Sequence, residues 1–387
     1  MAAGIQPGNG ETIDLQQQVA RLQALLEASR QVHSTIREEE VLEQVLRIVV
    51  RELEMAGAAF PGAELSYGHA PNGSGSEGVL AYPLQDREGR RMAELLVAPP
   101  GGRALTIYET DFIEGLALQA AVALENARNQ KRNLEFARVQ QDMDAARAIQ
   151  RSLLPHSLPV LAGYSLGFRS DTCYEVGGDY LDIVSQPDGS LLMAVADVAG
   201  KGMASAIMST GFRSAFRAMA SGGPPLDELA CRMNQHHWAE GEEARRRYVT
   251  AIFLRLYPEA GEIEVVNAGH NPGFLATPGS APRLFDATGT PLGMLPGMRY
   301  ASERWPFAPG ARLLFYTDGL TEVFRGDEEF GPERLLEEFL KCRAANADDI
   351  LDVLWAAIEA FSEGGPRGDD MTALAICRKS SAPEMPA

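Results

Sequence analysis

Four short acidic motifs contain the residues of this chain that are best suited to chemistry. Each places an aspartate within three residues of a glycine, at one end of an apolar run that is typical of a strand. Because glycine has no side chain, the backbone can approach closely there and present a carboxylate at a sheet edge. The motifs are Gly177-Gly178-Asp179-Tyr180-Leu181-Asp182, Asp197-Val198-Ala199-Gly200-Lys201-Gly202, Thr317-Asp318-Gly319 and Gly368-Asp369-Asp370-Met371-Thr372.

Carboxylates gathered in one place repel one another, and the repulsion raises their pKa values. Two divalent cations remove this difficulty, because a charge of about +4 balances four carboxylates. An all-oxygen ligand set is typical of Mg²⁺ or Mn²⁺ and not of zinc or copper. Each motif alone is also a common turn, but four in succession at expected strand ends favour a centre of two Mn²⁺ or Mg²⁺ ions.

Residues from about Gln141 to Lys379 resemble the PPM family of PP2C-like phosphatases, in the bacterial sporulation and stress-response branch (SpoIIE/RsbU-like). Two further segments carry the resemblance: Ala148-Ile149-Gln150-Arg151-Ser152-Leu153-Leu154-Pro155 and Asn267-Ala268-Gly269-His270-Asn271-Pro272. The resemblance implies that the catalytic, metal-binding groups are the side chains of Asp179, Asp197, Asp318 and Asp369, with the backbone carbonyl of Val198.

Three more polar residues of these motifs have two interpretations each. Asp182 and Asp370 either support the metal ligands, directly or through water, or are solvated turn residues. His270 either tunes the site and donates a proton, or stabilises its own loop through a hydrogen bond.

The implied reaction is hydrolysis of phosphoserine or phosphothreonine. Two metal ions activate a shared water that attacks phosphorus in line, so no phosphoenzyme forms. By resemblance, the substrate is a phosphorylated STAS-type anti-anti-sigma factor. A thiolate phosphatase is disfavoured because no cysteine has an arginine six positions later. The alternative function is a non-catalytic binding module of the same fold that holds a signalling partner.

The composition limits the cellular compartments in which the protein is expected and the class of partner that it is expected to bind. A net charge of −18 makes nucleic acid a poor partner. No apolar run approaches the roughly 18 residues that span a membrane, and the N-terminus lacks the pattern of a signal peptide. The four cysteines form no Cys-x-x-Cys pair, which disfavours a zinc site or a disulfide framework. We therefore expect a cytoplasmic protein with no membrane segment.

Apolar periodicity predicts two domains joined by a helix. Strands are expected at 78–84, 92–97, 164–169, 191–198, 248–256, 262–266, 273–276 and 312–316. A turn is expected at Pro71-Asn72-Gly73, and the linker helix should have an apolar stripe that includes Phe136, Val139 and Ile149. We expect an α+β fold throughout, and the resemblance implies an α-β-β-α sandwich with antiparallel sheets for the phosphatase domain. The predicted linker helix is either a dimerising coiled coil or part of one core. We expect a homodimer, and an upstream signalling partner or small ligand at the first domain, which loosely resembles a GAF-type sensor. The predicted boundaries are 1–26 (helix), 27–128 (GAF-like domain), 129–158 (linker helix), 159–379 (phosphatase domain) and 380–387 (disordered tail).

Overall fold

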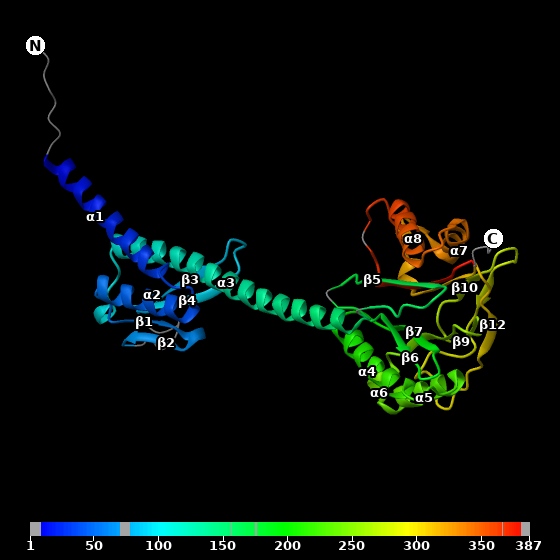
Figure 1. Cartoon of the computed structure of the whole chain (residues 1–387). Helices are drawn as coiled ribbons and strands as arrows, with labels where there is room; N and C mark the ends of the chain where they lie inside the picture. The colour runs from blue at the N-terminus through cyan, green and yellow to red at the C-terminus, as the bar shows by residue number, and fades with distance from the viewer. Residues whose placement is uncertain (1–8, 70–77, 156, 175, 366, 381–387) are drawn as a thin grey trace, which may run out of the picture. The chain divides into compact units, whose positions relative to one another are not determined.

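The computed structural model describes residues 9–69, 78–155, 157–174, 176–365 and 367–380 (Figure 1). The chain separates into two compact units, residues 1–140 and 141–387. Helix α3 (Ile107–Leu153) begins in the first unit and ends in the second. It stops two residues before Pro155, as expected of a residue that cannot continue a helix.

The first unit packs helices against a four-stranded antiparallel sheet of order β2-β1-β4-β3. Helix α2 places six apolar residues in the core at helical spacing, and three glutamates occupy its first turn, where the helix dipole favours negative charge. The elements are α1 (Asn9–Val32), α2 (Glu38–Glu52), β1 (Gly57–Phe60), η1 (Pro61–Ala63), β2 (Leu65–Gly68), β3 (Leu80–Gln85), β4 (Arg91–Ala98) and η2 (Pro100–Gly102).

The sequence predicted only part of this sheet. The expected strands at 78–84 and 92–97 correspond to β3 and β4, whereas β1 and β2 were not expected. Strand β1 reads Gly-Ala-Ala-Phe and has no β-branched residue, so it carries little strand signal. The predicted turn at Pro71-Asn72-Gly73 lies outside the described residues, as does nearly all of the predicted tail.

The second unit is a sandwich of two five-stranded antiparallel sheets with helices on both outer faces (Figure 1). One sheet has the order β12-β9-β8-β7-β6 and the other the order β11-β10-β13-β16-β5. The elements are β5 (Tyr164–Asp171), β6 (Tyr180–Ser185), β7 (Leu191–Val198), α4 (Met203–Ala220), α5 (Leu226–Ala239), α6 (Glu242–Arg245), β8 (Val249–Tyr257), β9 (Glu262–Ala268), β10 (Gly273–Ala276), β11 (Arg283–Phe285), β12 (Glu303–Pro306), β13 (Arg312–Tyr316), η3 (Asp318–Leu320), β14 (Phe324–Arg325), β15 (Glu328–Glu329), α7 (Gly331–Lys341), α8 (Ala347–Ser362) and β16 (Met371–Arg378).

Three apolar clusters account for these layers. One lies between the two sheets and includes Val195, Ile252 and Phe315. A second packs α4 and α5 on the β6–β9 sheet, and a third packs α7 and α8 on the other sheet. Alternate residues of β7 enter different clusters, as a strand buried on both faces requires. The predicted α+β fold with antiparallel sheets is confirmed.

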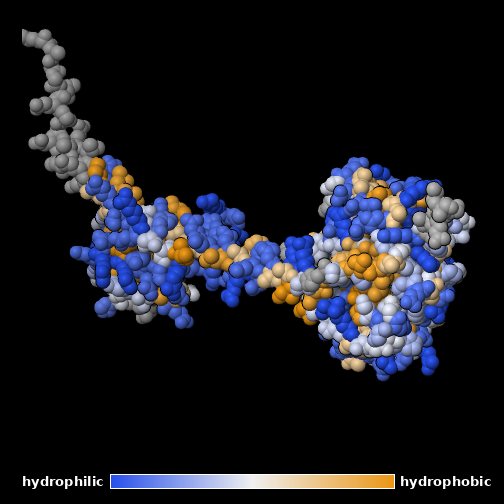
Figure 2. Space-filling view, viewed as in Figure 1, coloured by the Kyte–Doolittle hydropathy of each residue, from blue (hydrophilic) through white to orange (hydrophobic). Residues whose placement is uncertain are grey.

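Exposed apolar residues mark α1 and α3 (Figure 2). Phe136, Val139 and Ile149 on α3 have exposed fractions of 71%, 55% and 64%, so this predicted stripe is not buried within the chain itself. Val19, Leu22 and Leu26 on α1 are likewise exposed. No described helix meets the length and hydropathy that a membrane crossing requires.

Candidate active site

Antiparallel register brings the four acidic motifs to one end of the sandwich. Tyr180 at the start of β6 pairs with Ala196 near the end of β7, so Asp179 and Asp197 lie beside each other. In the other sheet Tyr316, the last residue of β13, pairs with Ala373, the third of β16. The loops that carry Asp318 and Asp369 therefore lie at the same end of these strands.

Thr317 connects the two sheets at this end. Its hydroxyl donates to Asp179 Oδ2 at 2.7 Å and accepts from the Thr372 backbone N–H at 3.0 Å. The side chain is fully buried, so its hydrogen bonds have no competition from bulk water. The sequence analysis included Thr317 only as part of a motif and assigned it no role, because nothing local indicates that its hydroxyl reaches a residue 138 positions away.

Gly178, in the first acidic motif, lies so close to the second motif that a residue with a side chain would not fit there. A Cβ on Gly178 would lie 2.8 Å from the Val198 carbonyl oxygen and 3.2 Å from Asp197 Oδ1. The Val198 carbonyl, a predicted ligand, therefore lies beside the Asp197 carboxylate and the loop that leads into Asp179. This is the close backbone approach that the Gly-Gly-Asp pattern predicts.

Asp370 holds this loop in place. Its Oδ2 accepts from the Gly178 backbone N–H at 2.9 Å, and its Oδ1 accepts from the Cys173 backbone N–H at 2.7 Å. The residue is buried, so it is not a solvated turn residue. Its carboxylate supports the backbone next to Asp179.

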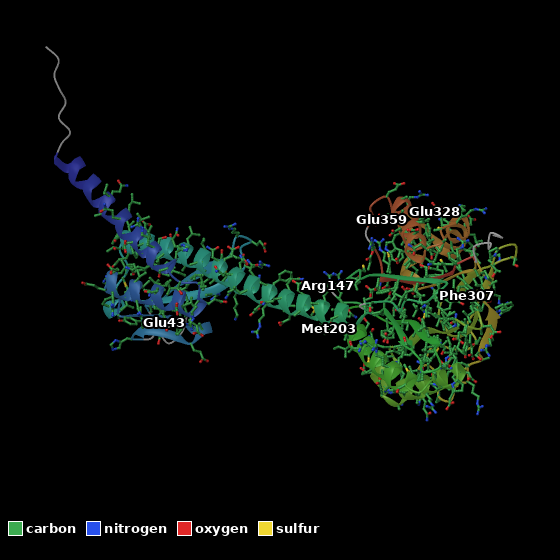
Figure 3. All side chains as sticks on the ribbon, viewed as in Figure 1. Glu43, Arg147, Met203, Phe307, Glu328 and Glu359 are labelled. Atoms are coloured by element: carbon green, nitrogen blue, oxygen red, sulfur yellow. The ribbon has the colours of Figure 1, made fainter. Side chains whose placement is uncertain are left out.

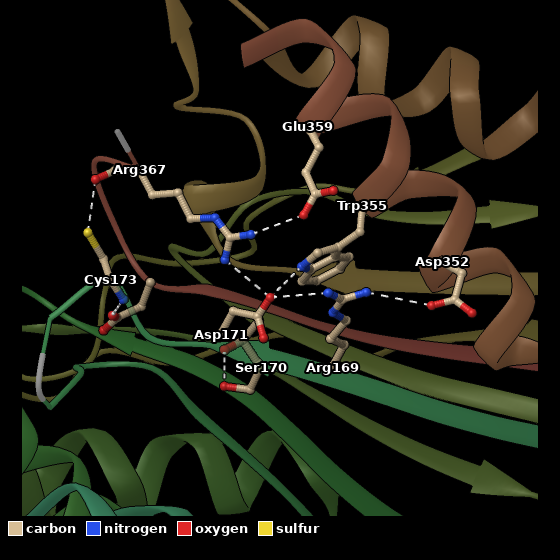
Figure 4. Close-up of polar contacts among 10 residues, drawn as sticks. Arg169, Ser170, Asp171, Cys173, Asp352, Trp355, Glu359 and Arg367 are labelled. Carbon is tan, nitrogen blue, oxygen red and sulfur yellow. Dashed lines mark hydrogen bonds and ion pairs between the residues drawn. The ribbon is translucent and has the colours of Figure 1, made fainter. Parts of the chain in front are cut away.

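Arg367 attaches the loop of Asp369 and Asp370 to its surroundings (Figure 4). Its guanidinium contacts Asp171 Oδ2 at 3.2 Å and Glu359 Oε1 at 3.3 Å. The indole N–H of Trp355 also donates to Asp171 Oδ2, at 2.8 Å. Strand β5 and helix α8 thus fix the residues that precede the acidic pair.

The acids interact strongly with one another. Burial raises the pKa of Asp197 to about 7, and the neighbouring charges of Asp318 and Asp369 contribute to that rise. Burial and the charge of Asp197 likewise raise the pKa of Asp179. The pKa of Asp318 is raised by burial and by Asp369. The raised pKa values of these three aspartates therefore agree with the repulsion expected among neighbouring carboxylates.

Two further charged residues belong to the cluster, and the sequence analysis assigned neither a role. Lys201 Nζ lies 2.9 Å from Asp369 Oδ2 and donates to the Gly368 carbonyl at 2.5 Å. Glu322 follows η3, and its pKa is raised by burial and by the charge of Asp318. The Gly-Lys-Gly pattern predicts a turn that carries a positive charge. Only the tertiary structure shows that this charge pairs with Asp369.

The donor chemistry of these residues fits a hard divalent cation. The donors are carboxylate oxygens and one carbonyl oxygen, and the buried negative charge exceeds the positive charge of Lys201. Within the described part of the chain, no three Asp, Glu, His or Cys side chains already form a compact cage for a metal ion.

Asp182 does not join this cluster. It is fully buried in an ion pair with Arg217 of α4, whose Nε and Nη2 atoms lie 2.6 and 2.7 Å from its two oxygens. The Tyr180 hydroxyl also donates to it, at 2.7 Å. Two-residue periodicity along β6 turns Tyr180 and Asp182 toward α4. Neither interpretation made from the sequence describes this ion pair.

His270 is a buried, neutral residue of its loop. Burial lowers its pKa to about 4. Its Nδ1 lies 2.9 Å from Thr250 Oγ1, and its backbone N–H donates to Asn267 Oδ1 at 2.7 Å. Thr250 is the strand partner of Asp197, so these contacts couple the loop to β7. This environment favours the loop-stabilising interpretation over proton donation.

The C-terminal end of α3 contacts the Gly-Gly loop. Gln150 accepts from the Gly177 backbone N–H at 3.0 Å and donates to the Gly177 carbonyl at 2.6 Å. One turn earlier Arg147, which Figure 3 labels, donates to the Tyr174 carbonyl at 2.8 Å. Arg213 of α4 donates to the last carbonyl of the helix, that of Leu153, at 3.1 Å. The conformation of this loop therefore depends on α3.

The first unit contains a hollow of about 750 Å³. Apolar residues such as Leu42, Phe60 and Leu124 line it, together with charged residues such as Arg37 and Lys131. An upstream signalling partner or a small ligand was predicted for this unit from the sequence, with no pocket residue named. The hollow is the structural feature to which that prediction would apply.

Comparison with known proteins identifies the second unit. Residues 187–379 match the family described as "Stage II sporulation protein E (SpoIIE)". Protein IcfG of Synechocystis is 25% identical over 262 residues, which are 61% of this chain and 41% of that protein. Two Bacillus subtilis proteins named phosphoserine phosphatase are also similar: RsbP is 26% identical over 183 residues (47% of this chain, 45% of RsbP), and RsbU is 22% identical over 248 residues (62% and 71%). The chain thus spans less than half of IcfG and of RsbP.

Solved structures show the same fold. The SiaA-PP2C domain of Pseudomonas aeruginosa superposes with a TM-score of 0.55 at 20% identity, covering 62% of this chain and 97% of that domain. A structure of RsbU and RsbW domains from Mycobacterium tuberculosis superposes with a TM-score of 0.50 at 24% identity, covering 59% of this chain and 64% of that one.

Proposed function

We propose that this chain, whose second unit belongs to the SpoIIE family of PP2C-like phosphatases, is a metal-dependent protein serine/threonine phosphatase. The observation that carries the proposal is the meeting of Asp179, Asp197, Asp318 and Asp369 at one end of the sandwich, where each of the first three has a raised pKa. Buried carboxylates without a counter-charge lower the stability of a protein. A cluster of such groups with raised pKa values therefore indicates a functional site.

Four aspartate side chains and the Val198 carbonyl would hold two Mn²⁺ or Mg²⁺ ions. When bound, these ions lower the pKa of water and offset charge on the phosphoryl oxygens. In the reaction a water oxygen forms a bond to phosphorus, the bond between phosphorus and the serine or threonine oxygen breaks, and that oxygen takes up a proton. The products are inorganic phosphate and the unmodified protein substrate.

The other residues of the site position its acids. Thr317 orients Asp179 through a buried hydrogen bond, which keeps one carboxylate oxygen in a defined direction. Asp370 and Gln150 fix the backbone of the Gly-Gly loop by accepting hydrogen bonds from Gly178 and Gly177 respectively. The proposed mechanism requires no side-chain nucleophile, because water supplies the attacking oxygen.

Hydrolysis of p-nitrophenyl phosphate tests this function. We expect turnover that requires Mn²⁺ or Mg²⁺ and that Asp318→Asn abolishes. Asp188→Asn replaces an exposed aspartate in the turn between β6 and β7, at the opposite end of these strands from Asp179 and Asp197, and should retain full turnover. A wild-type rate equal to that of Asp318→Asn would favour the alternative function, a non-catalytic module that binds a signalling partner.

The proposed natural substrate is a phosphorylated STAS-type anti-anti-sigma factor in the cytoplasm. The resemblance to the sporulation and stress-response branch supports this proposal, as do the two relatives named phosphoserine phosphatases. Asp318→Asn, which should bind substrate without turnover, can be used to capture the phosphoprotein. Recovery of phosphoproteins without a STAS domain would contradict this choice of substrate.

We also propose that the first unit is a GAF-like regulatory domain and that the chain forms a homodimer. The hollow of the first unit would take a small ligand or an upstream partner. The exposed stripe of Phe136 and Val139 would pair with the same stripe of a second copy, because burial of these side chains stabilises a coiled coil. Sedimentation velocity tests the dimer, and deletion of residues 1–128 tests whether the first unit regulates turnover.

A further inference from the structure

Lys201 is a cation placed among the acids of the site. Its ammonium group lies 2.9 Å from Asp369 Oδ2 and donates to the Gly368 carbonyl at 2.5 Å. These two contacts direct it at the acidic loop that precedes β16. The side chain itself is half-exposed, at 49%.

The backbone around Lys201 favours this placement. Gly200 and Gly202 both have positive φ, at 104° and 79°, so the chain makes a turn between β7 and α4 that residues with a Cβ would strain. The turn follows Asp197 directly, and it brings a lysine from one sheet to an acid of the other. The contact therefore links the two halves of the site.

The charges around Lys201 are unbalanced without a metal ion. Asp179, Asp197, Asp318 and Asp369 come to the same end of the sandwich, and Lys201 Nζ lies 2.9 Å from one of them, Asp369. One ammonium thus offsets part of the repulsion among several carboxylates. Asp369 Oδ1 accepts from the Asp370 backbone N–H at 2.9 Å, so a divalent cation at Asp369 would compete with the ammonium for Oδ2.

We propose that Lys201 is an internal counter-ion that competes with divalent metal for Asp369. This inference rests on the proposed function, because it assumes that Asp369 is a metal ligand. In the metal-free protein, Lys201 partly neutralises the acids. Metal binding must release its flexible side chain into solvent, so part of the metal's binding free energy is spent on breaking this ion pair. Lys201 is therefore a positioning residue that weakens metal affinity and stabilises the metal-free fold.

The test is a calorimetric titration of the full chain with Mn²⁺. Lys201→Met keeps the length of the side chain and removes its charge, so we expect its Kd for Mn²⁺ to be roughly two- to fivefold lower than that of the wild type, as a half-exposed ion pair implies. Lys201→Arg keeps the charge and should retain a Kd near the wild-type value. Lys341→Gln, which removes an exposed ion pair on α7, is the matched control and should leave the Kd unchanged.

Ionic strength provides a second readout that a purely structural role would not change. The ratio of wild-type to Lys201→Met Kd should fall toward one as KCl increases, because salt screens the ion pair. An unchanged or higher Kd for Lys201→Met would overturn the inference while wild-type Mn²⁺ binding upheld the proposed metal site. Failure of the wild type to bind Mn²⁺ or Mg²⁺ would refute both.

Discussion

Replacement of Asp197 by asparagine should stabilise the metal-free protein, although it removes a proposed catalytic group. Asp197, the penultimate residue of β7, lies among Asp179, Asp318 and Asp369, and its pKa is raised to about 7 from an ordinary value of 3.8. At pH 8 its ionised carboxylate is therefore held in an environment that opposes ionisation. Asparagine is nearly the same size and cannot ionise, so it removes this repulsion.

The size of the effect follows from the pKa shift. A shift of about 3 units corresponds to roughly 4 kcal/mol of unfavourable free energy for the ionised form. Side-chain rotation relieves part of this cost, so we expect a gain of about 2–4 kcal/mol in the free energy of unfolding. For a domain of this size that gain corresponds to roughly 5–15 °C in Tm.

Urea and thermal unfolding in EDTA at pH 8 measure this gain. Asp182→Asn is the matched control with the opposite sign. It breaks the buried pair with Arg217 and should cost about 2–4 kcal/mol, because it weakens hydrogen bonds between charged groups. An Asp197→Asn variant no more stable than the wild type in EDTA would show that the acids are already compensated. That result would refute the electrostatic argument for a metal site.

Four further predictions concern the same unit and the linker helix. In EDTA the wild type should lose stability as the pH rises from about 4 to 7, because folded Asp197 releases its proton near pH 7 and unfolded Asp197 near pH 4; urea midpoints across this range measure the loss. Gly178→Ala should cost roughly 1–3 kcal/mol in urea unfolding and lower the rate of turnover, because its Cβ would meet the Val198 carbonyl at 2.8 Å. Thr317→Val should cost about 1–3 kcal/mol and weaken Mn²⁺ binding measured by calorimetry, since Asp179 loses a 2.7 Å hydrogen bond. Phe136→Glu should shift a dimer toward monomer in sedimentation velocity, and an unchanged sedimentation coefficient would argue against the coiled coil.

Much of the second unit could be predicted from local patterns. Apolar runs bounded by turn residues predicted β5, β7, β8, β9, β10 and β13, whereas β6, β11, β12 and β14–β16 were not among the predicted strands. The order of strand runs and helix runs predicted antiparallel sheets. The acid-glycine motifs also predicted where the chain comes close to itself, as at Gly178 and the Val198 carbonyl. The first unit was predicted less completely, because a four-residue strand without β-branched residues has almost no local signal.

The sequence by itself determined the chemical types present at the candidate site: aspartates at strand ends, beside glycines. Only the tertiary structure decided how each side chain is used. Asp182 and Asp370 come from equivalent-looking motifs, yet β6 turns Asp182 toward Arg217 of α4, whereas Asp370 binds the loop before Asp179. Thr317 and Lys201 acquire their partners from the opposite sheet. The physical reason is that strand periodicity and antiparallel register set the direction of a side chain, while its partner comes from another element, 35 residues away for Asp182 and 192 for Asp370.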